Sequence, residues 1–182
     1  MRIRTATVDD APAIAAIYAP IVAETTISFE ETPPTPHEIA NRMEAVLVAF
    51  PWLVAEVDDA VAGYAYATRH QDRAAYRWAA NVSVYVAEHA RRGGIGRELY
   101  AELFSILASQ RYLRLYAGVT IPNPASEALH RLMGFEPIGT YRSVGYKMGG
   151  WHDVRWYGLA LGLSDTPREP ILFSDLHEIA QR

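Results

Sequence analysis

The feature that most constrains the fold of this chain is a glycine-bearing segment at residues 91–97, which reads Arg-Arg-Gly-Gly-Ile-Gly-Arg. Before it, apolar and polar residues alternate over residues 78–86, which is typical of a half-buried strand. After it, apolar residues recur at helical spacing over residues 95–110. The segment is therefore predicted to be a tight strand-to-helix turn.

The residues alone leave two interpretations of this turn open. Glycines let a backbone approach a ligand closely, exposed amides at a helix start bind phosphate oxygens, and arginines add complementary charge. The same glycines also suit a connection that only needs a tight bend. A dinucleotide site is the weaker alternative, because the chain lacks a GxGxxG motif here and has no acidic residue about twenty positions beyond.

Strands and helices are predicted to alternate irregularly along the rest of the chain. Asp9 is expected to cap the first helix, and Thr35, Pro36 and Glu38 form a sharper start signal for a helix that runs to about residue 48. The predicted strands are residues 3–5, 52–57, 61–68, 78–86, 113–119, 135–144 and 151–161. Further helices are predicted at residues 95–110 and 124–133, with a last turn or two at residues 174–181. This pattern favours a mixed sheet covered by helices.

Composition excludes several classes of protein. The chain has 182 residues, of which 50% are hydrophobic, as in a single soluble domain. A net charge of −4 argues against nucleic acid as the partner. The absence of cysteine excludes thiolate nucleophiles, disulfides, sulfur-ligated zinc and iron–sulfur clusters.

Metal, export and membrane insertion are not expected either. The six histidines stand too far apart for metal-ligand spacing, at positions 37, 70, 89, 130, 152 and 177. The first four residues lack the apolar core of a signal peptide, and the longest apolar stretch, residues 45–55, is too short for a membrane span. The expectation is a cytoplasmic protein without a metal.

Several motifs, taken together, resemble the GCN5-related N-acetyltransferase (GNAT) superfamily, and most closely its phosphinothricin N-acetyltransferase branch. The resemblance covers about residues 1–160. The matching segments occur in family order at residues 27–30, 51–56, 62–67, 83–86, 94–97, 122–123, 129–130 and 145–154. It implies an α/β (α+β) domain over residues 1–162, with a mixed, mostly antiparallel sheet of six or seven strands and helices on both faces. Residues 163–182 would form a C-terminal tail.

The resemblance also implies where acetyl-CoA, the cosubstrate, would bind. The backbone of Val84, Tyr85 and Val86 would pair with the pantetheine arm like an added strand, and one of its amides would donate to the thioester oxygen. The turn would hold the pyrophosphate, and Asn123 would bond the cofactor beyond it. The expected residues of the turn are Arg91, Arg92, Gly93, Gly94, Ile95, Gly96 and Arg97.

Two positions carry the proton chemistry that the resemblance implies. His130 lies seven residues after Asn123, where the family places the acid that serves the departing thiolate, and imidazole suits that role. Asn81 stands where the branch carries a Glu base, and an amide cannot take a proton at neutral pH. Asn81 would then orient a water, or another group would be the base. The candidates are Glu30, His70 and His152, none of which the sequence places.

The implied acceptor is the α-amine of a small amino-acid-like molecule such as phosphinothricin, attacked directly in a ternary complex. Phe29, Arg69, Arg73 and Tyr76 lie on segments that the resemblance places near it. Two alternatives remain open: another acceptor (methionine sulfoximine, arsinothricin, another amino acid or a polyamine), or a non-catalytic acyl-CoA-binding protein that lacks its base. A homodimer is expected, with Trp151 and Trp156 at the interface.

Overall fold

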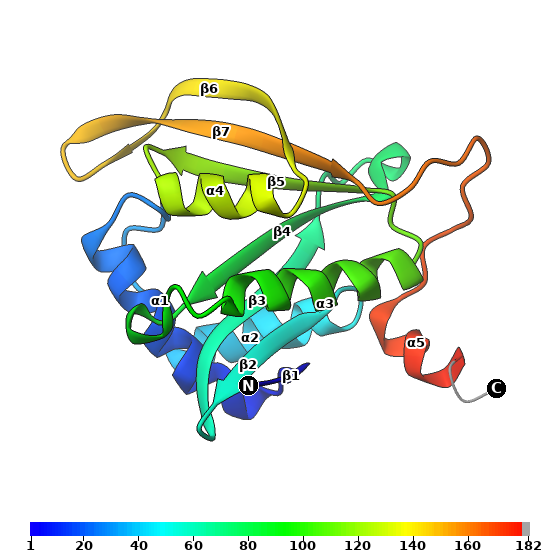
Figure 1. Cartoon of the computed structure of the whole chain (residues 1–182), viewed down its shortest axis with the longest axis horizontal. Helices are drawn as coiled ribbons and strands as arrows, with labels where there is room; N and C mark the ends of the chain where they lie inside the picture. The colour runs from blue at the N-terminus through cyan, green and yellow to red at the C-terminus, as the bar shows by residue number, and fades with distance from the viewer. Residues whose placement is uncertain (180–182) are drawn as a thin grey trace.

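A seven-stranded mixed sheet forms the centre of the structure, a computed structural model that describes residues 1–179 (Figure 1). Its spatial order is β1-β2-β3-β4-β5-β7-β6, and only β4 and β5 pair in parallel. The strands are β1 Arg2–Thr5, β2 Trp52–Val57, β3 Ala60–Arg69, β4 Ala79–Val86, β5 Arg114–Ile121, β6 Glu136–Lys147 and β7 Gly150–Ala160. The predicted mixed, mostly antiparallel sheet is confirmed.

Helices cover both faces of this sheet, as predicted. Helices α1 and α2 pack together on one face, called here the α1/α2 face. Helices α3 and α4 lie on the opposite face, the α3/α4 face (Figure 1). The α-helices are α1 Ala11–Glu24, α2 Pro36–Leu47, α3 Ile95–Ser109, α4 Pro124–Leu132 and α5 Phe173–Ile179. The described chain also contains three short 3₁₀ helices: η1 Val8–Asp10, η2 Ala74–Tyr76 and η3 Glu88–Ala90. In the described part of the chain, no helix is both long enough and apolar enough to span a membrane.

Local capping signals fix the starts of the first two helices. The Thr35 hydroxyl accepts from the Glu38 amide at 3.2 Å, and the Glu38 carboxylate accepts from the Thr35 amide at 2.7 Å, which confirms the predicted capping box. The expected cap at Asp9 is wrong. Thr7 is the cap residue of η1, and the carboxylate of Asp10 accepts from its amide and from Arg4. Because Arg4 is held by Asp10, the first strand and the first helix are tied together.

The alternation of β4 sends its side chains to two separate cores. Ala80 and Val82 join the cluster under α3, which is built around Leu99, Leu103 and Leu107. Tyr85, on the opposite face, packs edge-on against Tyr18 of α1 at 5.1 Å between ring centroids. Each face of the strand is thus committed to a different pair of helices, which fixes its register.

The parallel strands β4 and β5 diverge soon after they begin. Their ladder pairs run from Ala79–Arg114 to Asn81–Tyr116, and the described structure gives none beyond. From Val82 onward β4 is paired only with β3, while β5 pairs along its whole length with β7. An opening therefore runs through the middle of the sheet, starting next to Asn81 and Tyr116.

The only lysine in the chain, Lys147 at the end of β6, is buried at 7% exposure. Its ammonium donates to the carbonyls of Val22, near the end of α1, at 2.6 Å and of Ser28 at 2.7 Å. Cations are favoured at helix carboxyl ends, where carbonyls lack partners. The side chain thereby anchors the β6–β7 hairpin to the loop that follows α1.

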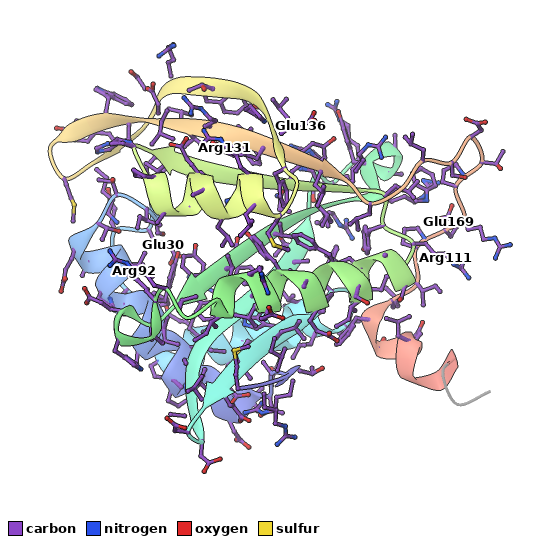
Figure 2. All side chains as sticks on the ribbon, in the orientation of Figure 1. Glu30, Arg92, Arg111, Arg131, Glu136 and Glu169 are labelled. Atoms are coloured by element: carbon purple, nitrogen blue, oxygen red, sulfur yellow. The ribbon has the colours of Figure 1, made fainter. Side chains whose placement is uncertain are left out.

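The segment after β7 runs past the carboxyl end of α3 and ends in α5 (Figure 1). Gln110, fully buried, donates to the carbonyls of Ala49 and Ile171, both at 2.8 Å. Arg111 donates to the Glu169 carbonyl, and Figure 2 shows these two residues side by side. The predicted last helix is confirmed up to Ile179, and its expected residues 180 and 181 lie outside the described chain.

Candidate active site

A narrow cleft occupies the opening between β4 and β5. Side chains from both faces of the sheet contribute to its walls, together with the start of α4. The lining residues are Ile27, Val82, Ser83, Val84, Tyr85, Tyr100, Ala117, Gly118, Val119, Thr120, Asn123, Ser126 and His130. Four of the residues predicted from the sequence, Val84, Tyr85, Asn123 and His130, are thus brought together although they lie on different elements.

One edge of β4 is free along this cleft. The Ala87 amide donates to the Ala62 carbonyl on β3 at 2.9 Å. Because backbone groups alternate along a strand, those of Val82, Val84 and Val86 point away from β3, toward the opening. A ligand with amide groups can pair with these atoms as an extra strand would.

The glycine-bearing turn lies at the end of β4 and opens α3. Arg92 and Gly94 have positive φ angles of 67° and 79°, and Gly94 is the residue that caps the helix. The left-handed backbone at Gly94 suits glycine, which has no Cβ to clash. Figure 2 shows Arg92 on this loop, next to the start of α3.

The amides of this turn are available to a ligand. From Arg92 to Gly96 they make no backbone hydrogen bond within residues 1–179. The Arg97 amide differs, since it donates to the Gly94 carbonyl at 3.0 Å inside the first helical turn. Consecutive open amides at a helix start attract phosphate oxygens. The Arg97 amide is therefore not open in the way that the amides from Arg92 to Gly96 are.

The side chains of the turn divide between solvent and core. Those of Arg91, Arg92 and Arg97 are exposed, whereas Ile95 is a core residue at 5% exposure, so only its backbone can reach a ligand. At Gly96 an added Cβ would lie 3.1 Å from Leu129 of α4, so this glycine permits close packing of α3 against α4. The interpretation of the turn as a tight connection is therefore supported at Gly96, while ligand binding by the open amides stays a prediction.

Asn123 has a structural task as well as a place in the cleft. It caps α4, and its side-chain oxygen accepts from the Ser126 amide at 3.2 Å. Its amide nitrogen remains the group that can face a ligand.

His130 is buried on the α3/α4 face at 4% exposure, with both ring nitrogens bonded. Nδ1 lies 2.7 Å from the Ser126 carbonyl, which can only accept, so Nδ1 carries the proton. Nε2 lies 3.1 Å from the Tyr100 hydroxyl, which then donates to it. The ring stacks on Tyr157 at 5.6 Å between centroids. The sequence analysis expected His130 in the site but missed Tyr100. Tyr100 reaches the cleft only because α3 packs against α4.

Burial decides the charge of His130. Loss of solvent lowers the pKa of His130 from the ordinary 6.5. The hydrogen bond to the Ser126 carbonyl raises the pKa, but by less than burial lowers it. The imidazole is therefore neutral at pH 7. Burial also raises the pKa of Tyr100, so its hydroxyl keeps its proton.

Asn81 lies on the other face, at the last paired position before the strands part. Its Oδ1 is 2.8 Å from Nδ1 of His70. The His70 ring stacks on Tyr116 at 4.2 Å and 24° between planes, and meets Trp156 and Tyr76 edge-on at 6.3 and 6.0 Å. Of the three candidate bases, His70 is the one that the structure places beside Asn81.

The four residues expected at the acceptor do not all gather there. Tyr76 packs edge-on against His70, and Arg73 precedes η2 on the same loop. The ring of Phe29 lies over Gly145, 6.4 Å from the His152 ring. Arg69 differs, because it is paired with Ala80 on the α3/α4 face and lies near Tyr112. Arg69 was expected among the acceptor residues, but the sheet separates its side chain from Asn81 and His70.

The other two candidate bases make their hydrogen bonds away from Asn81. Glu30 accepts two bonds from the Arg42 guanidinium, at 2.8 and 2.9 Å, which lower the pKa of that carboxyl. His152 lies 2.9 Å from the Lys147 carbonyl through Nε2, so that nitrogen donates within the hairpin. Asp153 meanwhile accepts a hydrogen bond from the Ser143 amide, so His152 and Asp153 form separate structural hydrogen bonds.

Among residues 1–179, no group of three or more His, Asp or Glu side chains could hold a metal ion.

The fold and the cleft define a class: an acyltransferase whose central parallel strands part around an acyl-CoA. A family model described as the acetyltransferase (GNAT) domain matches residues 3–156, and the chain belongs to this family. Its relatives include phosphinothricin N-acetyltransferases, which supports placing the chain in that branch of the family.

Three relatives illustrate this. The phosphinothricin N-acetyltransferase of Streptomyces viridochromogenes is 38% identical, over 92% of each chain. That of Alcaligenes faecalis is 43% identical, over 87% of this chain and 81% of the relative. The solved structure of a phosphinothricin acetyltransferase from Sinorhizobium meliloti in complex with acetyl-CoA has a TM-score of 0.89 and 33% identity, covering 94% of this chain and 97% of that one.

Proposed function

We propose that this chain transfers the acetyl group of acetyl-CoA to the α-amine of a small amino-acid-like acceptor such as phosphinothricin, by direct attack within a ternary complex. The observation that carries the proposal is the free edge of β4 from Val82 to Val86, which ends at the open amides of the glycine turn. Relatives with the names given above support both the reaction and the acceptor class.

The proposed roles of the cofactor site follow from the backbone. The edge at Val84 and Val86 would pair with the pantetheine amides, and the amides from Arg92 to Gly96 would bind the pyrophosphate. An amide of this edge would also donate to the thioester oxygen as it gains negative charge. The exposed arginines Arg91, Arg92 and Arg97 would add charge complementarity to the phosphates.

The two faces of the sheet would divide the proton chemistry. His130 and Tyr100 line the cleft from the α3/α4 face and would stabilise the departing thiolate by hydrogen bonding. Phe29, Arg73 and Tyr76 would surround the acceptor on the α1/α2 face, where arginine suits an anionic side group. Direct attack needs no covalent enzyme intermediate, in keeping with a chain without cysteine.

Calorimetry with acetyl-CoA and a thiol-release assay on a panel of amines test this function together. The panel contains phosphinothricin, methionine sulfoximine, arsinothricin, ordinary amino acids and a polyamine. Turnover on an amino acid with micromolar acetyl-CoA binding is the expected result. Turnover on another amine only would change the acceptor. Tight acetyl-CoA binding without turnover on any amine would favour a non-catalytic acyl-CoA-binding protein.

We also propose a homodimer in the cytoplasm, with residues 1–162 as the catalytic domain and residues 163–182 as its tail. The β6–β7 hairpin supports the dimer, because it exposes several large apolar side chains: Ile138, Tyr141, Val144, Tyr146, Met148 and Trp151. Trp156, also expected at the interface, lies 6.0 Å from Tyr141 between ring centroids, but its indole nitrogen is buried and its ring packs over Gly118. Sedimentation equilibrium of the wild type and of Trp151→Glu tests this assembly.

A further inference from the structure

An inference about the catalytic base deepens the proposed function and rests on it. An α-amine is largely an ammonium ion at neutral pH, and its nitrogen lone pair can attack a thioester only after a proton leaves. A base within hydrogen-bond reach of that nitrogen, directly or through one water, accelerates this step. Asn81 cannot be that base, because a neutral amide does not take a proton.

His70 has one ring nitrogen committed and one free. Nδ1 lies 2.8 Å from Oδ1 of Asn81, and an amide oxygen only accepts, so Nδ1 carries the proton. Nε2 is then the lone-pair nitrogen, and it has no hydrogen-bond partner within residues 1–179. Asn81 thus selects the tautomer in which His70 can accept a proton.

The surroundings of His70 hold the ring beside the point where β4 and β5 part, next to residues that line the cleft. Tyr116, on which the ring stacks, is paired with Asn81 at the point where the strands part. Trp156 meets the ring edge-on and itself packs against Gly118, a residue of the cleft wall. The ionisable side chains packed on the ring are Tyr76 of η2 and Tyr116 of β5. The half-buried ring is therefore held on its faces and edges while Nε2 stays open.

Other ionisable groups on the α1/α2 face are unsuited to the task. Burial raises the pKa of Tyr66 and Tyr85. The Glu30 carboxylate is bound by Arg42 and also accepts from the Tyr18 hydroxyl at 3.0 Å. His130 is on the opposite face with both nitrogens bonded.

We propose that His70 is the catalytic base of this acetyltransferase and that Asn81 is its positioning residue. Nε2 takes one proton from the acceptor ammonium and later releases it to solvent. The freed lone pair forms the C–N bond at the thioester carbonyl, and the C–S bond breaks with its electron pair on sulfur. The second proton lost by that nitrogen ends on the thiolate, so that the products are the amide and free CoA.

The first experiment replaces His70 and measures the pH dependence of kcat/KM with L-phosphinothricin or L-methionine sulfone, whichever the wild type acetylates. His70→Gln is expected to lower kcat/KM by about 100-fold at pH 7.5. It is also expected to lose the acid limb that imidazole titration gives the wild type. Added imidazole is expected to restore part of the rate of His70→Ala. His37→Gln, an exposed histidine on α2, is the matched control and should keep the wild-type profile.

The second experiment tests the positioning role of Asn81. Asn81→Asp keeps an oxygen acceptor for Nδ1 and adds negative charge, so the acid limb should move to higher pH with activity retained. Asn81→Leu removes the acceptor, and kcat should fall about tenfold with the KM for acetyl-CoA unchanged. Nitrogen-15 NMR of the imidazoles, which needs no acceptor, should show His70 protonated at Nδ1 in the wild type but not in Asn81→Leu.

The outcomes separate this inference from the proposed function. Turnover that persists in His70→Gln with its acid limb intact overturns the base assignment while leaving the acetyltransferase in place. A wild-type His70 protonated at Nε2 does the same, because in that tautomer Nε2 has no lone pair with which to take a proton. Acetyl-CoA binding without turnover on any amine overturns both.

Discussion

The hydroxyl of Tyr100 lies 3.1 Å from Nε2 of His130, and both side chains are buried where α3 meets α4. The pair lines the cleft from the face opposite to His70 and Asn81. The opening in the sheet is therefore flanked by one histidine on each face, one fully bonded and one with a free nitrogen. This asymmetry underlies the proposal that one side stabilises the thiolate and the other side deprotonates the amine.

Replacing His130 should affect turnover more than cofactor binding. His130→Phe keeps a ring against Tyr157 but removes the nitrogen that orients the Tyr100 hydroxyl. We expect kcat to fall by about 100-fold. The Kd of acetyl-CoA, measured by calorimetry, should stay within a few-fold of the wild type.

A double variant controls for the buried hydroxyl that this change leaves unpaired. An unsatisfied buried hydroxyl costs about 1–3 kcal/mol of stability. His130→Phe with Tyr100→Phe should regain part of the stability without regaining kcat. Equal losses in kcat and in acetyl-CoA binding would return His130 to a purely structural role.

The low pKa of His130 predicts an acid-sensitive fold. In the unfolded chain its imidazole protonates near pH 6.5, but in the folded protein only at lower pH. Between these values the unfolded state binds more protons, so stability is full above pH 6.5 and decreases as the pH falls. Urea unfolding at pH 7.5, 6.5 and 5.5 should show this loss, with a slope of at most about 1.4 kcal/mol per pH unit.

His130→Gln should show a flatter profile over the same range. Arginines lower the pKa values of the Asp10 and Glu30 carboxyls, so these groups lose their stabilising charge only below about pH 4.5. They therefore do not contribute to the change in stability between pH 7.5 and 5.5. A variant that loses stability as steeply as the wild type would contradict this assignment.

The free edge of β4 predicts an unusual tolerance for proline. The Val84 amide points away from β3, so Val84→Pro removes no ladder bond to that strand. The fold should persist by circular dichroism, while the Kd of acetyl-CoA rises at least tenfold because a strand-like contact is lost. Val84→Thr keeps the amide and is the control. Unchanged affinity in the proline variant would argue against pairing of the cofactor along this edge.

Lys147 is predicted to stabilise the acceptor side of the molecule. Lys147→Met leaves the carbonyls of Val22 and Ser28 without their donor, at a cost of about 3 kcal/mol. Arg142→Met removes an exposed cation from the same strand and should cost less than about 1 kcal/mol. Thermal unfolding compares the two. Equal losses of stability in the two variants would mean that the buried hydrogen bonds of the Lys147 ammonium contribute no more than an exposed cation does.

Local signals in the sequence were sufficient for most of the elements. The capping box at Thr35 and Glu38 involves neighbours in the chain, so its geometry follows from backbone spacing. The glycine at position 94 likewise marks a left-handed turn that few other residues accept. The alternation in β4 predicted two faces, because side chains in a strand alternate whatever packs on them.

The sequence by itself thus determined the fold class, the strand-to-helix turn and the positions of Asn81 and His130. Tertiary structure decided which other groups join them. His70 meets Asn81 only because β3 and its loop fold back onto β4, and Tyr100 meets His130 only where two helices pack. Arg69 went to the opposite face because its register on β3 places it opposite Ala80. Such partners depend on burial and register between distant segments, which no local spacing encodes.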